Sequence, residues 1–203
     1  MIGFVLASSS PARLATLRTA GIEPRVVVSG VDEDAVLAAA IEERGKLTPA
    51  ESSLLLARAK AEAVYYEGPL VLGCDSVLEL DGQAYGKPAD AADAVDRWRA
   101  MRGRSGVLHT GHWLVDNRAA TRSRSRGDVA STTVHFADVT DEEIEAYVAT
   151  GEPLQVAGAF TIDGLGGPFV TGVEGDHHAV VGLSLPLLRV MLADFGVRWH
   201  ELW

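Results

Sequence analysis

The sequence predicts an α/β protein built around a long, twisted, mixed β-sheet. Strand and helix patterns mix along the chain in an order that is not a strict βαβ array. The 203 residues contain no internal repeat and no flexible linker, and this length suits one domain or two lobes that share a core. We therefore expect residues 1–203 to form a single domain.

The first third of the chain carries clear helix-start and helix-stop signals. Ser10 is a suitable N-cap, Pro11 suits the first helical position, and Gly21 ends the apolar periodicity. The expected order is a buried strand at 2–7, a helix at 11–20, a strand at 23–29, an acidic loop at 30–35 and a strong helix at 50–66.

The remaining elements follow from alternation and capping. Thr132, Val134 and Phe136 alternate with polar neighbours, as in a half-buried strand, and Thr140 with Glu143 forms a capping box. The expected order is a strand, a polar interruption, a second strand and a turn within 69–82, a loop into a helix over 84–103, antiparallel strands at 106–117 and 127–139, a helix over 140–151, and a glycine-rich loop, short strands and a final helix over 153–196.

Charge and cysteine content exclude several classes of function. The net charge of −10 disfavours nonspecific binding to nucleic acid or to anionic membranes. The apolar stretch 179–192 is too short for a membrane span and contains Pro186 and Arg189. Cys74 is the only cysteine and no signal peptide is visible, so we expect a cytoplasmic protein without disulfides, nucleic acid partners or membrane contact.

The segment "ASSSPAR" (7–13) joins the first strand to the first helix. A helix N-terminus offers unpaired N–H groups and a positive dipole end, Ser8 and Ser10 add hydroxyls, and Arg13 adds a planar fork suited to phosphate. These features predict an anion site. An ordinary helix cap with a surface arginine is the alternative.

A carboxylate and two lysines stand in unusual surroundings. Asp75 interrupts the apolar run "VLGCDSVL", and a buried carboxylate is costly unless it is paired or bound to metal. Lys60 lies in an alanine-rich helix, and Lys87 lies between Gly86 and Pro88. These residues are candidates for a ligand site, with a turn aspartate, a surface lysine and a turn lysine as the alternatives.

Two acidic loops and three basic or histidine-containing segments carry weaker signals. Asp32, Glu33 and Asp34 can hold Mg²⁺ through water, and Asp163 lies in a glycine-rich loop that a ligand can approach, but solvated turns explain both. The remaining segments favour structural or solvated roles over metal, substrate or nucleic acid binding: His109 with His112, His177 with His178, and Arg118, Arg122, Arg124 and Arg126 in an expected hairpin loop.

Seven segments occur in the order expected for the Maf family, which the chain resembles from about residue 4 to about residue 192. They are "LASSSPAR", "ARAKAEAV", "VLGCDSVLELDG", "YGKP", "GRSGVLHTG", "YVATGEPLQVAGAFTIDGLGG" and "GDHHAVVGLSLPLL". The resemblance implies a nucleoside triphosphate pyrophosphatase that cleaves the α–β phosphate bond of standard or modified nucleotides. It also implies a divalent cation (Mg²⁺ or Mn²⁺), a homodimer, and a two-lobed body with a central cleft similar to inosine triphosphate pyrophosphatases.

The resemblance also assigns roles to individual residues. It implies that Asp75 is catalytic, as a general base or a metal ligand, and that Glu33, beside Asp32, contributes to the metal site. The phosphate-binding residues that it implies are Ser8, Ser10, Arg13, Lys60 and Lys87.

Four positions depart from the family pattern. Ala12 replaces an arginine, Ser76 and Asp163 differ from the thymidine/uridine triphosphate branch, and Gly106 replaces a histidine. The resemblance associates the first three of these positions with substrate choice. We therefore expect Ser76 and Asp163 to contact substrate. A carboxylate at Asp163 would favour a base edge that donates hydrogen bonds, such as guanine or an amino-bearing pyrimidine. A catalytically weak nucleotide-binding regulator of cell division is the alternative function.

Overall fold

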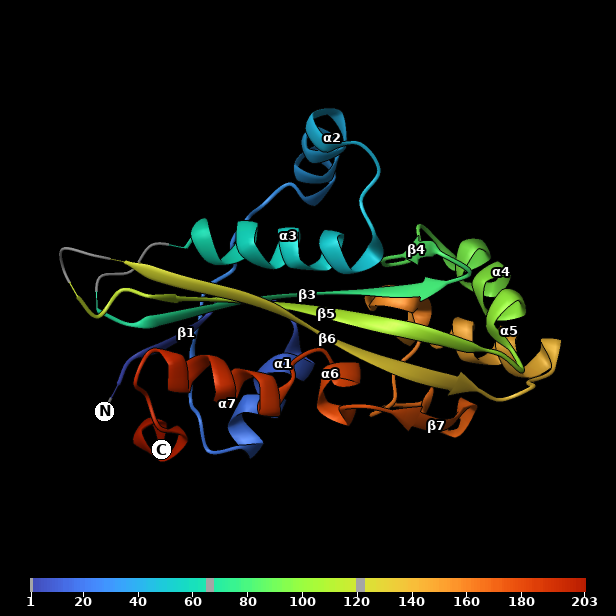
Figure 1. Cartoon of the computed structure of the whole chain (residues 1–203). Coiled ribbons are helices and arrows are strands. Elements are labelled where there is room, and N and C mark those ends of the chain that lie inside the picture. The colour runs from blue at the N-terminus through green and yellow to red at the C-terminus, as the bar shows by residue number, and fades with distance from the viewer. Residues whose placement is uncertain (1, 65–67, 120–122) are drawn as a thin grey trace.

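A seven-stranded mixed sheet forms the centre of the computed structural model, which describes residues 2–64, 68–119 and 123–203 (Figure 1). The strand order is β2-β1-β3-β5-β6-β7, and β4 pairs with β3 off this path. This confirms the predicted α/β class. The strands are β1 (Phe4–Leu6), β2 (Arg25–Val26), β3 (Leu70–Leu80), β4 (Gln83–Tyr85), β5 (Ser105–Asp116), β6 (Arg124–Phe136) and β7 (Val170–Glu174).

Two of the helix starts predicted from caps are confirmed. Ser10 Oγ accepts the Arg13 N–H at 3.4 Å, and the Thr140–Glu143 capping box forms in full. The α-helices are α1 (Pro11–Thr19), α2 (Glu33–Arg44), α3 (Pro49–Glu62), α4 (Ala91–Met101), α5 (Asp141–Ala149), α6 (His177–Val181) and α7 (Leu185–Asp194). Residues 65 and 66, at the end of the helix predicted for 50–66, lie outside the described residues.

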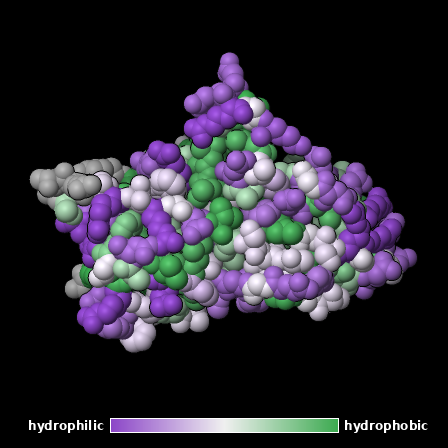
Figure 2. Space-filling view, in the orientation of Figure 1, coloured by the Kyte–Doolittle hydropathy of each residue, from purple (hydrophilic) through white to green (hydrophobic). Residues whose placement is uncertain are grey.

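Helix α3 packs directly on one face of the long strands, and α2 lies outside it (Figure 1). Two glycines permit this close approach. A Cβ at Gly73 would lie 2.2 Å from Ala57 O, and a Cβ at Gly111 would lie 2.4 Å from Ser53 O. The exposed end of α2 is hydrophilic (Figure 2), where Glu42 and Glu43 stand in solvent.

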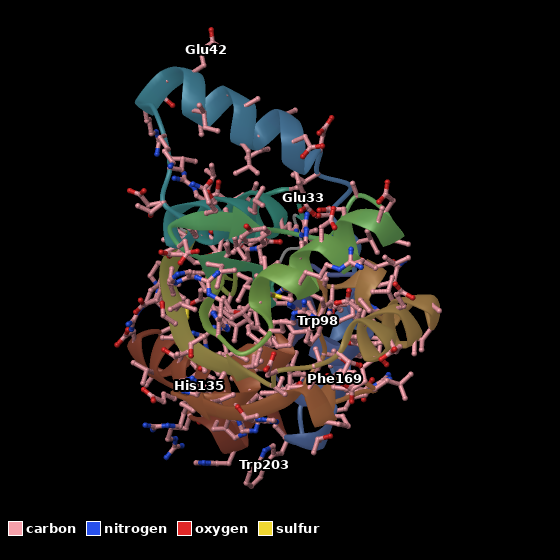
Figure 3. The ribbon with its side chains drawn as sticks, turned by 90° about the vertical axis from the view of Figure 1, so that its right-hand side faces the viewer. Glu33, Glu42, Trp98, His135, Phe169 and Trp203 are labelled. Atoms are coloured by element: carbon pink, nitrogen blue, oxygen red, sulfur yellow. The ribbon has the colours of Figure 1, made fainter. Side chains whose placement is uncertain are left out.

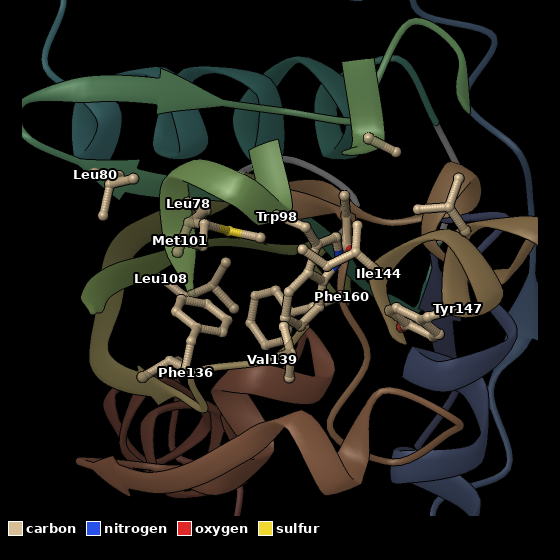
Figure 4. Close-up of a cluster of buried hydrophobic side chains, with 14 of the residues drawn as sticks. Leu78, Leu80, Trp98, Met101, Leu108, Phe136, Val139, Ile144, Tyr147 and Phe160 are labelled. Atoms are coloured by element: carbon tan, nitrogen blue, oxygen red, sulfur yellow. The ribbon is translucent and has the colours of Figure 1, made fainter. Parts of the chain in front are cut away.

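The opposite face of the sheet carries two apolar cores, one toward each end of the long strands. One packs Leu78, Leu108 and Val134 against Trp98 of α4 and its neighbours (Figure 4). The other packs inward residues of β1, β3 and β5 against α1 and α7, including Leu6, Leu17, Leu72, Leu114, Leu188 and Met191.

Polar side chains on that same face separate the two cores. Along β5, Thr110 and His112 stand between Leu108 and Leu114, and both are fully buried. On β3, Ser76 lies directly opposite Thr110 in the antiparallel register. Buried polar groups require hydrogen-bond partners. We therefore expect a functional site in or beside this belt of polar residues.

Two sequence predictions about elements are wrong, and a third element is shorter than predicted. No polar interruption divides 69–82, because β3 continues through Asp75 and alternation sends successive side chains to opposite faces. The acidic loop at 30–35 is a helix start, because Asp32 Oδ1 accepts the Ala35 N–H at 3.0 Å and α2 begins at Glu33. The strand predicted for 23–29 is only Arg25–Val26.

The expected hairpin is present, because β5 and β6 are consecutive antiparallel strands, but its described arginines form ion pairs instead of lying in a solvated loop. Arg124 and Arg126 lie within β6, and Arg118 and Arg124 donate to Asp116 at 2.8 and 2.6 Å. Both also donate to Phe195 O, the acceptor at the end of α7. Arg122 lies outside the described residues. None of the helices in the described ranges is both long and apolar enough to cross a bilayer.

Candidate active site

Strand β3 has an open edge at its centre. β1 pairs with Leu70–Leu72 and β4 pairs with Leu78–Leu80, so within the described chain the segment 73–77 has no strand partner on that side. The Ala7 N–H donates to Leu72 O at 2.8 Å, which brings the turn between β1 and α1 to this edge. The predicted phosphate-binding turn and the predicted catalytic aspartate are therefore neighbours.

Asp75 projects from β3 toward α3 and meets a lysine there. Lys60 Nζ lies 2.6 Å from Asp75 Oδ1 and 2.8 Å from Glu33 Oε1. Burial raises the pKa of the Asp75 carboxyl, and the charges of Lys60 and Arg13 oppose that rise. Lys60 is thus a buried ion-pair partner rather than a surface lysine.

Glu33 reaches this lysine because α2 starts there. Figure 3 shows Glu33 at the end of α2 that faces the body and Glu42 at the far end. Asp32 caps the helix, so its carboxylate is engaged with the Ala35 N–H. Only one of the two predicted acidic residues therefore points to Lys60.

Arg13 occupies the opposite side of β3. Its Nε donates to Gly182 O at 2.7 Å, Nη1 donates to Ser8 Oγ at 3.2 Å, and Nη2 donates to Ser76 Oγ at 3.1 Å. All three partners are neutral, and no ion pair to a carboxylate forms within the described part of the chain. The guanidinium is held in place while its positive charge stays available to an anion.

Ser8 and Ser10 line the turn before α1. Ser8 Oγ accepts the Ser10 N–H at 3.2 Å, and Ser10 caps the helix. Ser8 is buried and Ser10 half-buried, so both lie beside the Arg13 fork rather than in bulk solvent. The helix cap and the predicted anion turn are the same feature.

A buried histidine that the sequence did not assign to the site holds the turn behind Arg13. His112 Nε2 accepts the Ser184 N–H at 2.8 Å, and its Nδ1 lies 2.9 Å from Thr110 O. Burial lowers the pKa of His112 to about 4, so the ring is a neutral acceptor at pH 7. The sequence contains the segment "HTGH" (109–112), but the hydrogen-bond partner of His112 is Ser184, 72 residues away, which only the tertiary structure identifies.

The structure leaves two predicted substrate residues apart from this cluster. Lys87 and Asp163 are exposed, and among described residues no hydrogen bond or ion pair joins their side chains to Asp75, Lys60 or Arg13. The Gly158 N–H donates to Gly86 O at 3.0 Å, so the loop that leads to Asp163 contacts the segment that holds Lys87.

The carboxylates of Asp75 and Glu33 are the residues that fit a divalent cation. Both bring an oxygen to the same ammonium, Lys60 Nζ. Mg²⁺ is commonly held by one or two carboxylates, with water and substrate phosphates completing the shell. No group of three or more metal-ligating side chains occurs in the described ranges, so a protein-only cage is not formed there.

Comparison with known proteins agrees with the motif order. The family model described as Maf-like protein matches residues 3–195. A nucleoside triphosphate pyrophosphatase of Salinispora tropica is 60% identical over 98% of this chain and 86% of that protein. One of Streptomyces coelicolor is 58% identical over 98% of this chain and 93% of that protein.

Two solved structures give weaker matches. A HAM1 protein from Coxiella burnetii has a TM-score of 0.38 and 20% identity, covering 68% of this chain and 75% of that chain. A nucleoside-triphosphatase (dITP/XTP pyrophosphatase) from Mycobacterium abscessus has a TM-score of 0.36 and 13% identity, covering 96% and 98%. TM-scores this low carry no argument about the site. On the family model and the two close relatives, the chain belongs to the Maf family.

Proposed function

We propose that this chain is a nucleoside triphosphate pyrophosphatase that hydrolyses the α–β phosphate bond to yield a nucleoside monophosphate and pyrophosphate. The observation that carries the proposal is the open centre of β3, where a buried Asp75–Lys60 pair lies on one side and Arg13, held by three neutral hydrogen-bond acceptors, lies on the other. The names of relatives at 60% and 58% identity support the same activity.

The cationic groups suit a triphosphate. Arg13 presents a rigid fork for phosphate oxygens, and the N-terminus of α1 adds N–H donors beside Ser8 and Ser10. Phosphoryl transfer needs mainly positioning and electrostatic stabilisation from the protein. Lys87 and Asp163, whose side chains are exposed, are also proposed to contact substrate.

Asp75 is proposed to take the proton of the attacking water or to hold the metal. Either role requires the ionised carboxylate, which burial disfavours and the charges of Lys60 and Arg13 favour. Lys60 is therefore proposed to have a second function besides charge attraction to phosphate, because its positive charge favours the ionised form of Asp75.

Mg²⁺ or Mn²⁺ would be held by Glu33 and Asp75. The cation would offset the charge of the phosphates. A homodimer and a cytoplasmic location remain predictions. Sedimentation of the purified chain would test the first, and fluorescence imaging of the tagged protein in its host would test the second.

A substrate panel tests the proposed activity. The purified chain is incubated with the common ribo- and deoxyribonucleoside triphosphates and with Mg²⁺, and pyrophosphate and phosphate are measured separately. We expect pyrophosphate with a nucleoside monophosphate from at least one substrate. Release of single phosphate would indicate another phosphohydrolase. Tight binding without turnover would favour the nucleotide-binding regulator, for which Ala12 and Gly106 are the notable departures.

A further inference from the structure

A line of four hydrogen-bonding groups runs from Arg13 through the polar belt to α6. Arg13 Nη2 lies 3.1 Å from Ser76 Oγ, Ser76 Oγ lies 3.0 Å from Thr110 Oγ1, and Thr110 Oγ1 lies 2.8 Å from Ala179 O. Thr110 is fully buried and takes no direct part in the proposed chemistry.

The direction of every proton in this line is fixed by its two ends. A guanidinium can only donate and a backbone carbonyl can only accept. Thr110 therefore donates its single hydroxyl hydrogen to Ala179 O and must accept the hydroxyl hydrogen of Ser76. A lone pair of Ser76 Oγ is then free to accept the N–H of Arg13 Nη2, as a guanidinium donor requires.

We propose that Thr110 is a positioning residue that sets the hydroxyl direction of Ser76 and, through it, the orientation of Arg13. The inference rests on the proposed pyrophosphatase function, because Arg13 matters through the phosphates it binds. With its hydrogen committed to Thr110, Ser76 has only a lone pair left for a ligand. The substrate group that meets Ser76 is then an N–H or O–H donor rather than a phosphate oxygen.

Thr132 offers a matched control on the neighbouring strand. It is buried on the same face, its hydroxyl donates to Asp176 O at 3.1 Å, and it therefore also anchors the start of α6. Its hydroxyl exchanges hydrogen bonds with the Asp176 backbone and, among the described residues, forms none with Ser76. Thr132→Val removes an anchoring bond without touching the line to Arg13.

The experiment is a double-mutant cycle on kcat/KM for pyrophosphate release, because such a cycle separates coupling from independent effects. We expect Thr110→Val to lower kcat/KM by about tenfold, on the scale of one buried hydrogen bond near a charge. In the Ser76→Ala background the same change should cost less than about threefold. Thr110→Ser should restore kcat/KM to within about threefold of wild type, and Thr132→Val should stay within that range.

Several results would overturn the inference while leaving the proposed function intact. Equal losses from Thr110→Val with and without Ser76→Ala would show that Thr110 only anchors α6. An equal loss from Thr132→Val would show the same. If Thr110→Val does not fold, the cycle is run with Thr110→Cys, which keeps the volume but provides only a weak donor. A wild-type chain that releases no pyrophosphate from any nucleotide would instead defeat the proposed function.

Discussion

Lys60 Nζ lies 2.6 Å from Asp75 Oδ1, because helix α3, which carries Lys60, packs on strand β3, which carries Asp75. The pair is buried, with about one tenth of each side chain exposed. Three predictions test this pair and the residues of the proposed active site around it. A fourth tests the separate cluster of Asp116 with Arg118 and Arg124.

Removal of the charge on Asp75 tests the catalytic centre. Asp75→Asn should lower turnover by at least about 10²-fold, as the loss of a general base does. Steady-state pyrophosphate release measures this, with circular dichroism to confirm folding. Asp116→Asn is the matched control, because Asp116 is a buried carboxylate on the neighbouring strand whose partners are Arg118 and Arg124. A folded Asp75→Asn enzyme with near-normal turnover would contradict the assignment.

The metal role of Glu33 predicts a change in cation dependence. Glu33→Gln should raise the Mg²⁺ concentration for half-maximal activity by at least about tenfold, because a carboxylate ligand is lost. Glu42→Gln makes the same charge change at the far end of α2 (Figure 3) and should leave that concentration unchanged. The titration of activity with Mg²⁺ distinguishes them, and equal midpoints for both variants would remove Glu33 from the metal site.

The three acceptors around Arg13 predict that lysine cannot replace it. Arg13→Lys should lower kcat/KM by about 10- to 100-fold, because one ammonium cannot meet Gly182 O, Ser8 and Ser76 at once. Arg18→Lys is the control on the same helix, where Arg18 forms an exposed pair with Glu23. Wild-type kinetics in Arg13→Lys would show that only the charge is needed.

The Asp116 cluster predicts a pH-dependent stability. Hydrogen bonds from Arg118, and then from Arg124, hold the pKa of the Asp116 carboxyl well below its usual range. A carboxyl with a lowered folded pKa stabilises the protein above its unfolded pKa of about 3.9, and this contribution is lost as the pH falls through the folded pKa.

Asp116→Asn should therefore lower Tm at pH 7, by about 4 to 8 °C for a loss of about 2 kcal/mol. The difference from wild type should shrink below about pH 4. Thermal unfolding from pH 3 to pH 8 measures it, with the exposed Asp81→Asn as a control of small effect. A difference that does not change with pH would show that the charge of Asp116 contributes nothing.

Local signals predicted the elements whose causes are local. Ser10 and Thr140 start helices because a side-chain oxygen satisfies an N–H three residues ahead. The alternation along β6 placed Thr132, Val134 and Phe136 on one buried face. The same approach failed at Asp32, where an acidic segment suggested solvent but the carboxylate caps α2.

Contacts between distant segments could not be predicted in the same way. Asp75 appeared to break a strand, whereas alternation within one continuous strand sends it toward α3 and sends Ser76 toward Arg13. The direction of the Ser76 hydroxyl depends on Thr110, 34 residues away, which becomes its neighbour only through the β3–β5 register.

The sequence by itself determined the α/β class, the helix caps, the Maf motif order and the residue types from which a phosphate site is built. Those properties depend on neighbours a few residues apart or on the order of motifs. Only the tertiary structure decided that Glu33 joins Lys60 and Asp75, and that Arg13 is held by neutral partners. The physical reason is that sheet register and helix packing bring these groups together across long sequence separations.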